Sequence, residues 1–258
     1  MTPGFSIHAL AGLGALVFFA GAVDALAGGG GLITLPAYLA FGLSPALLLG
    51  TNKLSSSIGT SAAVARYWRE LRLPLAPFAP VALAALAGSL AGALLALLLD
   101  PCWLRPLVLL ALPVLAAASF IRPRWGEEDE TAGLTKRQLT VRGSATGFGV
   151  GAYDGFFGPG AGTFYAIGLA RLCGYGLLGA TARAKLLNLA SNVAALAAFL
   201  CMGRVDLRIG LLMGAANAAG NIAGSHLGLK RGAAGIRPAL ALVSAGLFAK
   251  IALDLLRK

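Results

Sequence analysis

Four consecutive glycines interrupt an apolar run in the stretch DALAGGGGLITLP, which covers Asp24–Pro36. A glycine in a helix interior costs roughly 1 kcal/mol relative to alanine, so a helix is expected to break there. The flanking residues are apolar enough to lie in lipid, where a break must have its free backbone groups satisfied by protein or at a water-filled cavity. The second half repeats the pattern in DGFFGPGAGTF, residues Asp154–Phe164. The chain therefore carries two glycine-rich breaks, each shortly after an aspartate.

Composition places the chain among the polytopic membrane proteins. Of its 258 residues, 58% are hydrophobic and 12% are charged, whereas a soluble domain carries about 25% charged residues. The formal charge is +11, but the basic residues fall mostly in short loops between apolar runs, as the positive-inside rule requires. The expected partner is therefore the lipid bilayer, and no nucleic acid is expected.

Three cysteines, Cys102, Cys173 and Cys201, show no paired spacing. Neither a disulfide framework nor a metal site is predicted from them, and no cofactor is expected. Met1–Ala27 lacks a basic start and its apolar character continues beyond it. We therefore interpret it as a retained first span and not as a signal peptide.

The predicted fold is an all-α bundle of about eight transmembrane helices, since about 20 apolar residues cross a bilayer. It consists of two repeats, 1–121 and 143–258, joined by a hydrophilic linker at 122–142. The glycine-rich segments are expected as broken or re-entrant helices. In chain order the apolar segments are Phe5–Ala27, the half-span Leu32–Leu43, Ala46–Val64, Pro77–Leu99, Leu104–Ile121, Gly143–Phe157, Thr163–Leu172, Leu177–Met202, Leu207–Leu229 and Pro238–Leu256.

The two halves are copies of one another. A shift of 132 residues places Lys53 on Lys185, and a shift of 130 places Asp24 on Asp154. A duplicated membrane protein with a broken helix at equivalent positions in both halves is typical of secondary transporters, whose site lies near the midplane. Tight helix crossing could explain one isolated glycine motif. It explains less well a pair of breaks that each follow an aspartate by four residues.

Lys53 and Lys185 are the strongest candidates for substrate binding. Each lies in an apolar span with polar neighbours, and an ionisable residue within a span is a functional hypothesis by default. The alternative is that each side chain snorkels from near a helix end. Arg183 would add a second cation to the later site. Two lysines that face glycine-rich breaks predict a site for a small anion.

Further groups are expected around this anion. Exposed N–H groups at the starts of Leu32–Leu43 and Thr163–Leu172 would add the positive ends of half-helix dipoles. Several polar residues lie at helical spacings near the lysine of their own segment, and helix–helix hydrogen bonding explains any single one of them equally well. They are Asn52, Ser55 and Ser56 near Lys53, and Asn188, Ser191 and Asn192 near Lys185. Tyr153 and Tyr165 are candidates for cavity lining, and His226 is expected to be structural. Besides the three cations, the predicted substrate-binding residues are Gly30, Gly31, Thr34, Asn52, Gly160, Thr163 and Asn188.

Asp24 and Asp154 have three candidate roles: to pair with the lysines, to cap the half-helices or to carry protons. A carboxylate in a medium of low dielectric constant favours its protonated form unless it is paired, which suits a proton carrier. Proton coupling and structural capping both stay open at this point.

Loop charges predict the orientation only once the number of crossings is known. With eight spans, Arg66–Arg72 shares a side with the linker and the C-terminal tail, and both termini lie in the cytoplasm. Arg171 and Lys230–Arg237 then fall near the other side. This count makes the repeats parallel. If the glycine-rich segments count as crossings, the repeats become inverted.

The sequence resembles the TauE/SafE family of membrane transporters, also called the sulfite exporter family. The motifs are AGGGGLITLP at Ala27–Pro36, GTNK at Gly50–Lys53 and DGFFGPGAGT at Asp154–Thr163. The resemblance covers essentially the whole chain. It implies a duplicated helix bundle that moves small sulfur anions, such as sulfite, sulfoacetate or related sulfonates, across the inner membrane. The family's Thr-Asn-Lys triplet is intact at Thr51–Lys53, whereas the second half reads ARAK at Ala182–Lys185.

The predicted function is that of a secondary transporter, either an exporter or a proton-coupled carrier of such anions. An anion channel of the same fold is the first alternative. A membrane enzyme acting on an anionic lipid is less favoured, because the sequence has no recognisable catalytic set and only two histidines, His8 and His226. The oligomeric state is left open, with a homodimer as one option.

Overall fold

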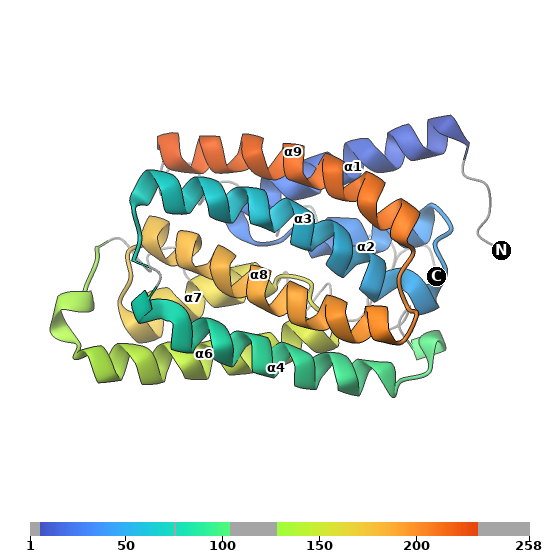
Figure 1. Ribbon diagram of the computed structural model, residues 1–258. Coiled ribbons are helices and arrows are strands. Elements are labelled where there is room, and N and C mark those ends of the chain that lie inside the picture. The colour runs from blue at the N-terminus through green and yellow to red at the C-terminus, as the bar shows by residue number, and fades with distance from the viewer. Residues whose placement is uncertain (1–5, 75, 104–127, 232–258) are drawn as a thin grey trace, which may run out of the picture.

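The computed structural model describes residues 6–74, 76–103 and 128–231 (Figure 1). Within these ranges the protein is a bundle of eight α-helices with no strand, as the sequence predicts. The predicted spans Leu104–Ile121 and Pro238–Leu256 lie outside the described residues, as does most of the linker. Three of the described helices, α1, α4 and α8, are long and apolar enough to cross a membrane.

Of the described helices, four belong to each half. Those of the first half are α1 (Ile7–Ala27), α2 (Gly31–Ala40), α3 (Pro45–Leu71) and α4 (Ala79–Leu97). Those of the second half are α6 (Lys136–Phe156), α7 (Ala161–Cys173), α8 (Leu177–Cys201) and α9 (Leu207–Arg231). Short 3₁₀ turns lie at Ala76–Phe78, Pro101–Trp103 and Thr131–Gly133.

Helix α6 begins inside the segment predicted as a linker. Thr135 accepts a hydrogen bond from the backbone N–H of Gln138, and the Gln138 side chain accepts from the backbone N–H of Thr135. This reciprocal capping box satisfies two N–H groups that the first turn leaves free. It fixes the start of the helix in a region whose composition is hydrophilic.

Both glycine-rich breaks turn the chain back on itself. Gly28 ends α1 in the left-handed conformation with φ +78°, which costs glycine nothing. Helix α2 then returns along α1, because Gly30 packs against Asp24 while Phe41 lies beside Gly12 near the start of α1. In the second half, Gly158 and Gly160 have φ +103° and +77° between α6 and α7. Each break is therefore the tip of a helical hairpin, the re-entrant form of the two that the sequence allows.

Glycines allow close helix packing between the two halves at two repeat-equivalent interfaces, α4 with α6 and α9 with α1, which we call the glycine seams. Gly88 of α4 meets the backbone carbonyl of Phe148 in α6, and Gly220 of α9 meets the carbonyl of Phe18 in α1. A shift of 132 relates the two glycines, and a shift of 130 relates the two phenylalanines. Because a Cβ at either glycine would overlap the opposing backbone, only small residues allow this approach. In each seam, a helix from one half packs on the first helix of the other half.

The two repeats have inverted topology. Helices α3 and α9 run in the same direction, since Gly210 packs on Leu54 and Gly228 on Tyr67. Helix α8, the repeat counterpart of α3, runs the other way: Gly50, near the start of α3, packs on Phe199, near the end of α8. Figure 1 shows the same opposition between α3 and α8. The hairpins reverse the chain once more per half than an eight-span count assumes, and this resolves the choice between parallel and inverted copies.

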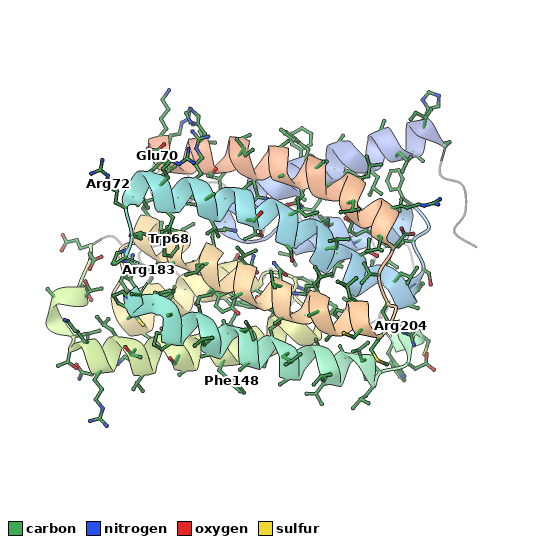
Figure 2. All side chains as sticks on the ribbon, in the orientation of Figure 1. Trp68, Glu70, Arg72, Phe148, Arg183 and Arg204 are labelled. Carbon is green, nitrogen blue, oxygen red and sulfur yellow. The ribbon has the colours of Figure 1, made fainter. Side chains whose placement is uncertain are left out.

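Basic side chains concentrate at one end of the bundle. Arg66 lies 2.7 Å from His226 Nδ1, and Arg142 donates to the carbonyl of Leu172 at 3.0 Å, which joins the ends of α3 and α9 and those of α6 and α7. Figure 2 shows Arg72 and Arg183 at this end and Arg204 at the other. We call the first the basic end; its described Lys and Arg residues are Arg66, Arg69, Arg72, Lys136, Arg137, Arg142, Arg171, Arg183, Lys230 and Arg231.

This grouping corrects the sequence-based assignment of loops to sides. Arg171 and Lys230–Arg231 were expected opposite Arg66–Arg72, whereas the structure places them at the same end. The reason is the extra reversal at α2 and α7, which the eight-span count leaves out. Arg204 and Arg208 lie at the opposite end, between α8 and α9.

Candidate functional site

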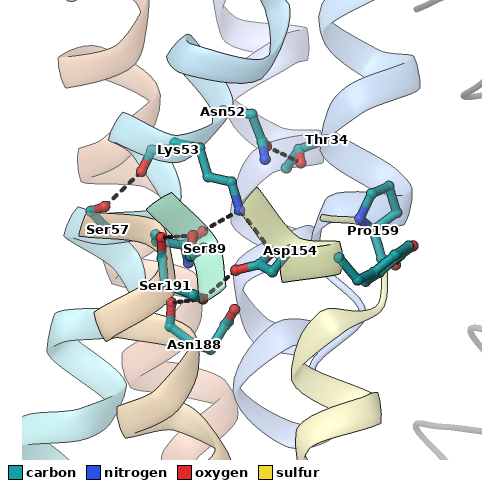
Figure 3. Close-up of polar contacts among 11 residues, drawn as sticks. Thr34, Asn52, Lys53, Ser57, Ser89, Asp154, Pro159, Asn188 and Ser191 are labelled. Carbon is teal, nitrogen blue, oxygen red and sulfur yellow. Dashed lines mark hydrogen bonds and ion pairs between the residues drawn. The ribbon is translucent and has the colours of Figure 1, made fainter. Parts of the chain in front are cut away.

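A buried ion pair joins the two halves beside the second glycine-rich break (Figure 3). Nζ of Lys53 in α3 lies 2.7 Å from Oδ1 of Asp154 in α6, and the two side chains are 2% and 3% exposed. A Cβ built on Gly158 would lie 3.2 Å from the same Nζ. The hairpin tip therefore approaches the ammonium group closely, and glycine there leaves room for it.

Neutral polar groups from α8 form hydrogen bonds with this pair, and one from α4 supports them. Lys53 also donates to Oδ1 of Asn192 at 3.0 Å, and Ser191 donates to the second carboxylate oxygen of Asp154. Ser89 donates to the backbone carbonyl of Ser191 at 2.6 Å. Lys53 thus donates two hydrogen bonds within the protein, and both carboxylate oxygens of Asp154 accept one.

A second ion pair lies beside the first break. Nζ of Lys185 in α8 is 2.9 Å from Oδ2 of Asp24 in α1, with side chains 1% and 12% exposed. The same ammonium donates to the backbone carbonyl of Asp24. The other carboxylate oxygen accepts from the backbone N–H of Gly30 at 3.3 Å. Asp24 therefore binds a lysine and also ties the tip of its hairpin to α1.

The two ion pairs are equivalent under the repeat, and each takes its lysine from one half and its aspartate from the other. Their surroundings differ, because Asn192 corresponds to Thr60. Among the described atoms, the buried Thr60 hydroxyl has no hydrogen-bond partner. The first pair is therefore the more completely hydrogen-bonded of the two.

The hairpin tips touch one another between the ion pairs. Gly28 packs against the backbone of Gly162 and Thr163, and the Thr163 hydroxyl donates to the carbonyl of Ala27 at 2.5 Å. Gly31 faces Pro159 across the same contact. Gly160 precedes the first residue of α7. Of the predicted site residues, Gly31 and Thr163 therefore lie in the contact between the two hairpin tips, whereas Gly30 packs on Asp24 within its own half.

Two other predicted residues bond to each other. Thr34 of α2 donates to Oδ1 of Asn52 in α3 at 2.5 Å, directly before Lys53 in sequence (Figure 3). Asn188 lies near the Asp154 side of the cluster, where its backbone carbonyl accepts from Ser191 at 3.0 Å. Tyr153 donates to the carbonyl of Pro159 at 2.6 Å and so braces the second tip.

Arg183 does not join this cluster. Residues 183 and 185 are two apart on α8, so their side chains point to nearly opposite sides of the helix. The Arg183 guanidinium lies 4.1 Å from the centre of the Tyr175 ring and donates to the carbonyl of Gly179 at 3.2 Å. Burial raises the pKa of Tyr175, so the ring under the guanidinium stays a neutral phenol.

Arg183 instead borders a separate cavity of about 400 Å³ at the basic end. The polar and charged lining comes from Lys136, Thr140, Tyr175 and Arg183. The remaining wall is apolar and includes Pro77, Phe78, Val81 and Leu139. We call this cavity the vestibule. Its two cations lie on α6 and α8, the helices that carry Asp154 and Lys185 further along.

Sequence reasoning missed two features of the site. It grouped Ser191 and Asn192 with Lys185, their neighbour on α8, whereas both bond to the Lys53–Asp154 pair. It also gave no role to Ser89, whose contact crosses from α4 to α8. A helical periodicity test could have found the shared face of Ser191 and Asn188, but not the helix that this face meets.

The chain matches the family model described as sulfite exporter TauE/SafE over residues 13–251. It is 38% identical over 249 residues to the probable membrane transporter protein ORF9 of Sinorhizobium sp, covering 96% of this chain and 94% of that protein. It is 38% identical over 246 residues to the probable membrane transporter protein YfcA of Escherichia coli K12, covering 94% and 90%. A probable membrane transporter protein of Haemophilus influenzae is 33% identical, with 96% of both chains covered. No solved structure matches.

Proposed function

Because this chain belongs to the TauE/SafE family of sulfite exporters and is a membrane transporter, we propose that it carries small sulfur anions across the inner membrane. The family name favours sulfite, and we extend the proposal to short sulfonates because they present the same kind of negatively charged sulfur–oxygen group. The observation that carries the proposal is the pair of buried lysines, each beside a hairpin tip and each paired with an aspartate of the other half. An intramembrane charge at a broken helix is the usual mark of a transporter's substrate site.

The proposed binding step is an exchange of partners at the lysines. A sulfonate or sulfite oxygen would take the place of the Asp154 carboxylate on Lys53, or of the Asp24 carboxylate on Lys185. Backbone N–H groups at the hairpin tips would hold further oxygens, together with the side chains of Thr34 and Asn52, which bond to each other next to Lys53 in sequence. Charge-assisted hydrogen bonds of this kind are about twice as strong as neutral ones.

The proposed transport step is a movement of the halves relative to one another. Each ion pair bridges the halves, so breaking it removes a link between them. Inverted repeats allow two states of similar energy in which the site opens to opposite sides. In this structure both lysines are buried and paired with aspartates, and we assign it to a closed form of the transporter.

Asp24 and Asp154 are the proposed proton carriers. Each aspartate bonds to a lysine that the anion must also use, so protonation of the carboxylate and binding of the anion act on the same group. Capping of the hairpin by Asp24 is compatible with this role, because Gly30 bonds to the oxygen that the lysine leaves free.

We also propose an orientation with the basic end in the cytoplasm, since short cytoplasmic loops carry the excess of Lys and Arg. The start of α1 lies at the opposite end (Figure 1). This orientation puts the beginning of α1 on the outer side of the inner membrane. It replaces the expectation, drawn from the eight-span count, that the N-terminus is cytoplasmic.

The test is a flux assay in proteoliposomes with sulfite, sulfoacetate and thiosulfate, each with and without a proton gradient. A carrier is expected to exchange labelled anion against unlabelled anion in the absence of any gradient. A channel would conduct without such exchange stimulation, and its flux would not saturate at low concentrations. If a folded preparation moved none of the three anions, the assigned substrate class would be rejected.

A further inference from the structure

The two ion pairs together carry no net charge. Two ammonium groups, of Lys53 and Lys185, face two carboxylates, of Asp154 and Asp24. All four residues are buried, with at most 8% of any one exposed. The lysines were expected to give the site a positive charge, but in the closed state each charge is already matched.

Among the residues that the structure describes, the other titratable groups around the pairs are tyrosines and the second lysine. Tyr153 and Tyr165 lie near Asp154, and Tyr67 of α3 lies near Asp24. Lys53 is also within electrostatic range of Asp24. A tyrosine is neutral at physiological pH, and the remaining bonded partners, Ser191 and Asn192, carry no charge. Nothing in this set offers a charge to an incoming anion unless a pair opens.

Adding an anion alone would leave a negative charge buried without compensation. An uncompensated buried charge is strongly unfavourable, and so is the removal of one partner from a buried pair. The carboxylate that the anion displaces would remain close to it, so two negative groups would share one ammonium. A proton on the displaced carboxylate removes both penalties, because a neutral acid needs no ionic partner.

We propose that each negative charge of the substrate enters together with one proton, which binds the aspartate whose lysine the substrate takes, so that transport is electroneutral symport. The inference rests on the proposed function and specifies its coupling. Either Lys53–Asp154 or Lys185–Asp24 serves a monoanion, and both together serve a dianion.

The proton balance of one cycle is as follows. A proton from the side to which the site is open forms an O–H bond on the aspartate, and the lysine ammonium keeps its own protons throughout. The lysine then donates to the anion in place of the carboxylate. On the other side the anion leaves, the O–H bond breaks to release the proton, and the ion pair forms again. An inward proton gradient would therefore drive uptake, and export requires an outward anion gradient.

The experiment uses the purified protein in liposomes that contain a pH-sensitive dye, with potassium and valinomycin to set the membrane potential. Methanesulfonate is a monoanion and sulfoacetate a dianion at neutral pH. We expect one proton to enter per methanesulfonate and two per sulfoacetate, with initial rates that do not change with the potential. Net uptake of labelled anion into anion-free liposomes without proton entry, or a rate that follows the potential, would overturn the coupling while leaving the transporter proposal intact. If neither anion exchanges, and sulfite and thiosulfate also fail, both proposals fall.

Substitution of one aspartate assigns the protons to the pairs. In Asp154→Asn the lysine has no anionic partner, so sulfoacetate should enter with one proton and its rate should become sensitive to the potential. Asp24→Asn is the repeat-related variant and should behave alike, which keeps the test available if one variant does not fold. Asp206→Asn is the matched control. Asp206 is also buried but accepts from the N–H of Ile209 at the start of α9, outside the pairs. An unchanged proton ratio in both pair variants would reject the assignment.

Discussion

Lys53 of α3 donates to Asp154 of α6 at 2.7 Å, 101 residues further along the chain, and the repeat places Lys185 on Asp24 in the same way. Each contact takes one partner from each half. The halves are thus held together at their centre by charges and at their flanks by glycine seams. A movement of the halves that opens the site has to break the charged contacts.

Removal of one partner should destabilise the protein more than removal of both. Lys53→Met leaves the Asp154 carboxylate buried without a partner, which costs about 3–5 kcal/mol. Lys53→Met combined with Asp154→Leu removes both charges and should recover most of that loss. Thermal unfolding in detergent measures the difference. Binding of the dianion sulfoacetate should weaken strongly in both variants, because only the Lys185 pair is left; sulfoacetate binding that is unchanged in the double substitution would exclude Lys53 from the site.

The hairpin tips should not accept a side chain. Gly28→Ala would force a β-carbon into the backbone of Gly162 in a left-handed conformation, so we expect a loss of stability of about 1–3 kcal/mol. Gly149→Ala is the matched control, because Gly149 is an α6 residue with open space around it. That change should stabilise by about 0.5–1 kcal/mol through helix propensity. Equal effects of the two substitutions on the unfolding temperature would contradict the tip contact.

Two natural cysteines report the orientation. Cys102 and Cys201 are exposed at the end opposite the basic end, whereas Cys173 is buried. With the basic end in the cytoplasm, a membrane-impermeant maleimide added to intact cells should label Cys201 in a Cys102→Ser, Cys173→Ser background once it can cross the outer membrane. Arg72→Cys, placed at the basic end in a chain without the natural cysteines, should react only after the inner membrane is opened. The reverse pattern would invert the assignment.

The vestibule should affect the capture of the anion and not its passage. Arg183→Gln removes a fixed cation from the vestibule wall. The apparent KM for anion supplied from the basic end should rise several-fold, the more so at low ionic strength, while the maximal rate stays within about twofold. Arg171→Gln changes the same charge at the same end but outside the vestibule wall, and is expected to be neutral. A drop in maximal rate without a change in KM would place Arg183 elsewhere in the cycle.

Composition and local pattern predicted a large part of this molecule. The glycine-rich runs predicted the two helix breaks. Charged residues that are rare in apolar surroundings identified Lys53, Lys185, Asp24 and Asp154 as site candidates. The repeat was visible because charged residues that match across 132 residues are uncommon in such a composition. The family assignment that these motifs indicated is confirmed by the family model and the relatives.

What the sequence could not give is the set of contacts between segments far apart in the chain. Local spacing assigns Ser191 and Asn192 to Lys185, because all three lie on one helix, but says nothing of the crossing that brings them to Lys53. The direction of each half depends on whether a ten-residue helix such as α2 reverses the chain. Hydropathy does not decide that, since a short apolar helix can equally continue a span or return along it.

The glycine seams have a consequence for synthesis of the protein. Helix α4 presents Gly88 and Gly92 to α6, a helix that leaves the ribosome only after the whole first half has been made. Until then the small-residue face of α4 has no backbone to pack against, and the acceptor for Lys53 has not been translated. The first half inserted alone would carry Lys53 and Asp24 without their partners, which is costly in a bilayer. The first half therefore reaches its stable packing only once the second half has been made.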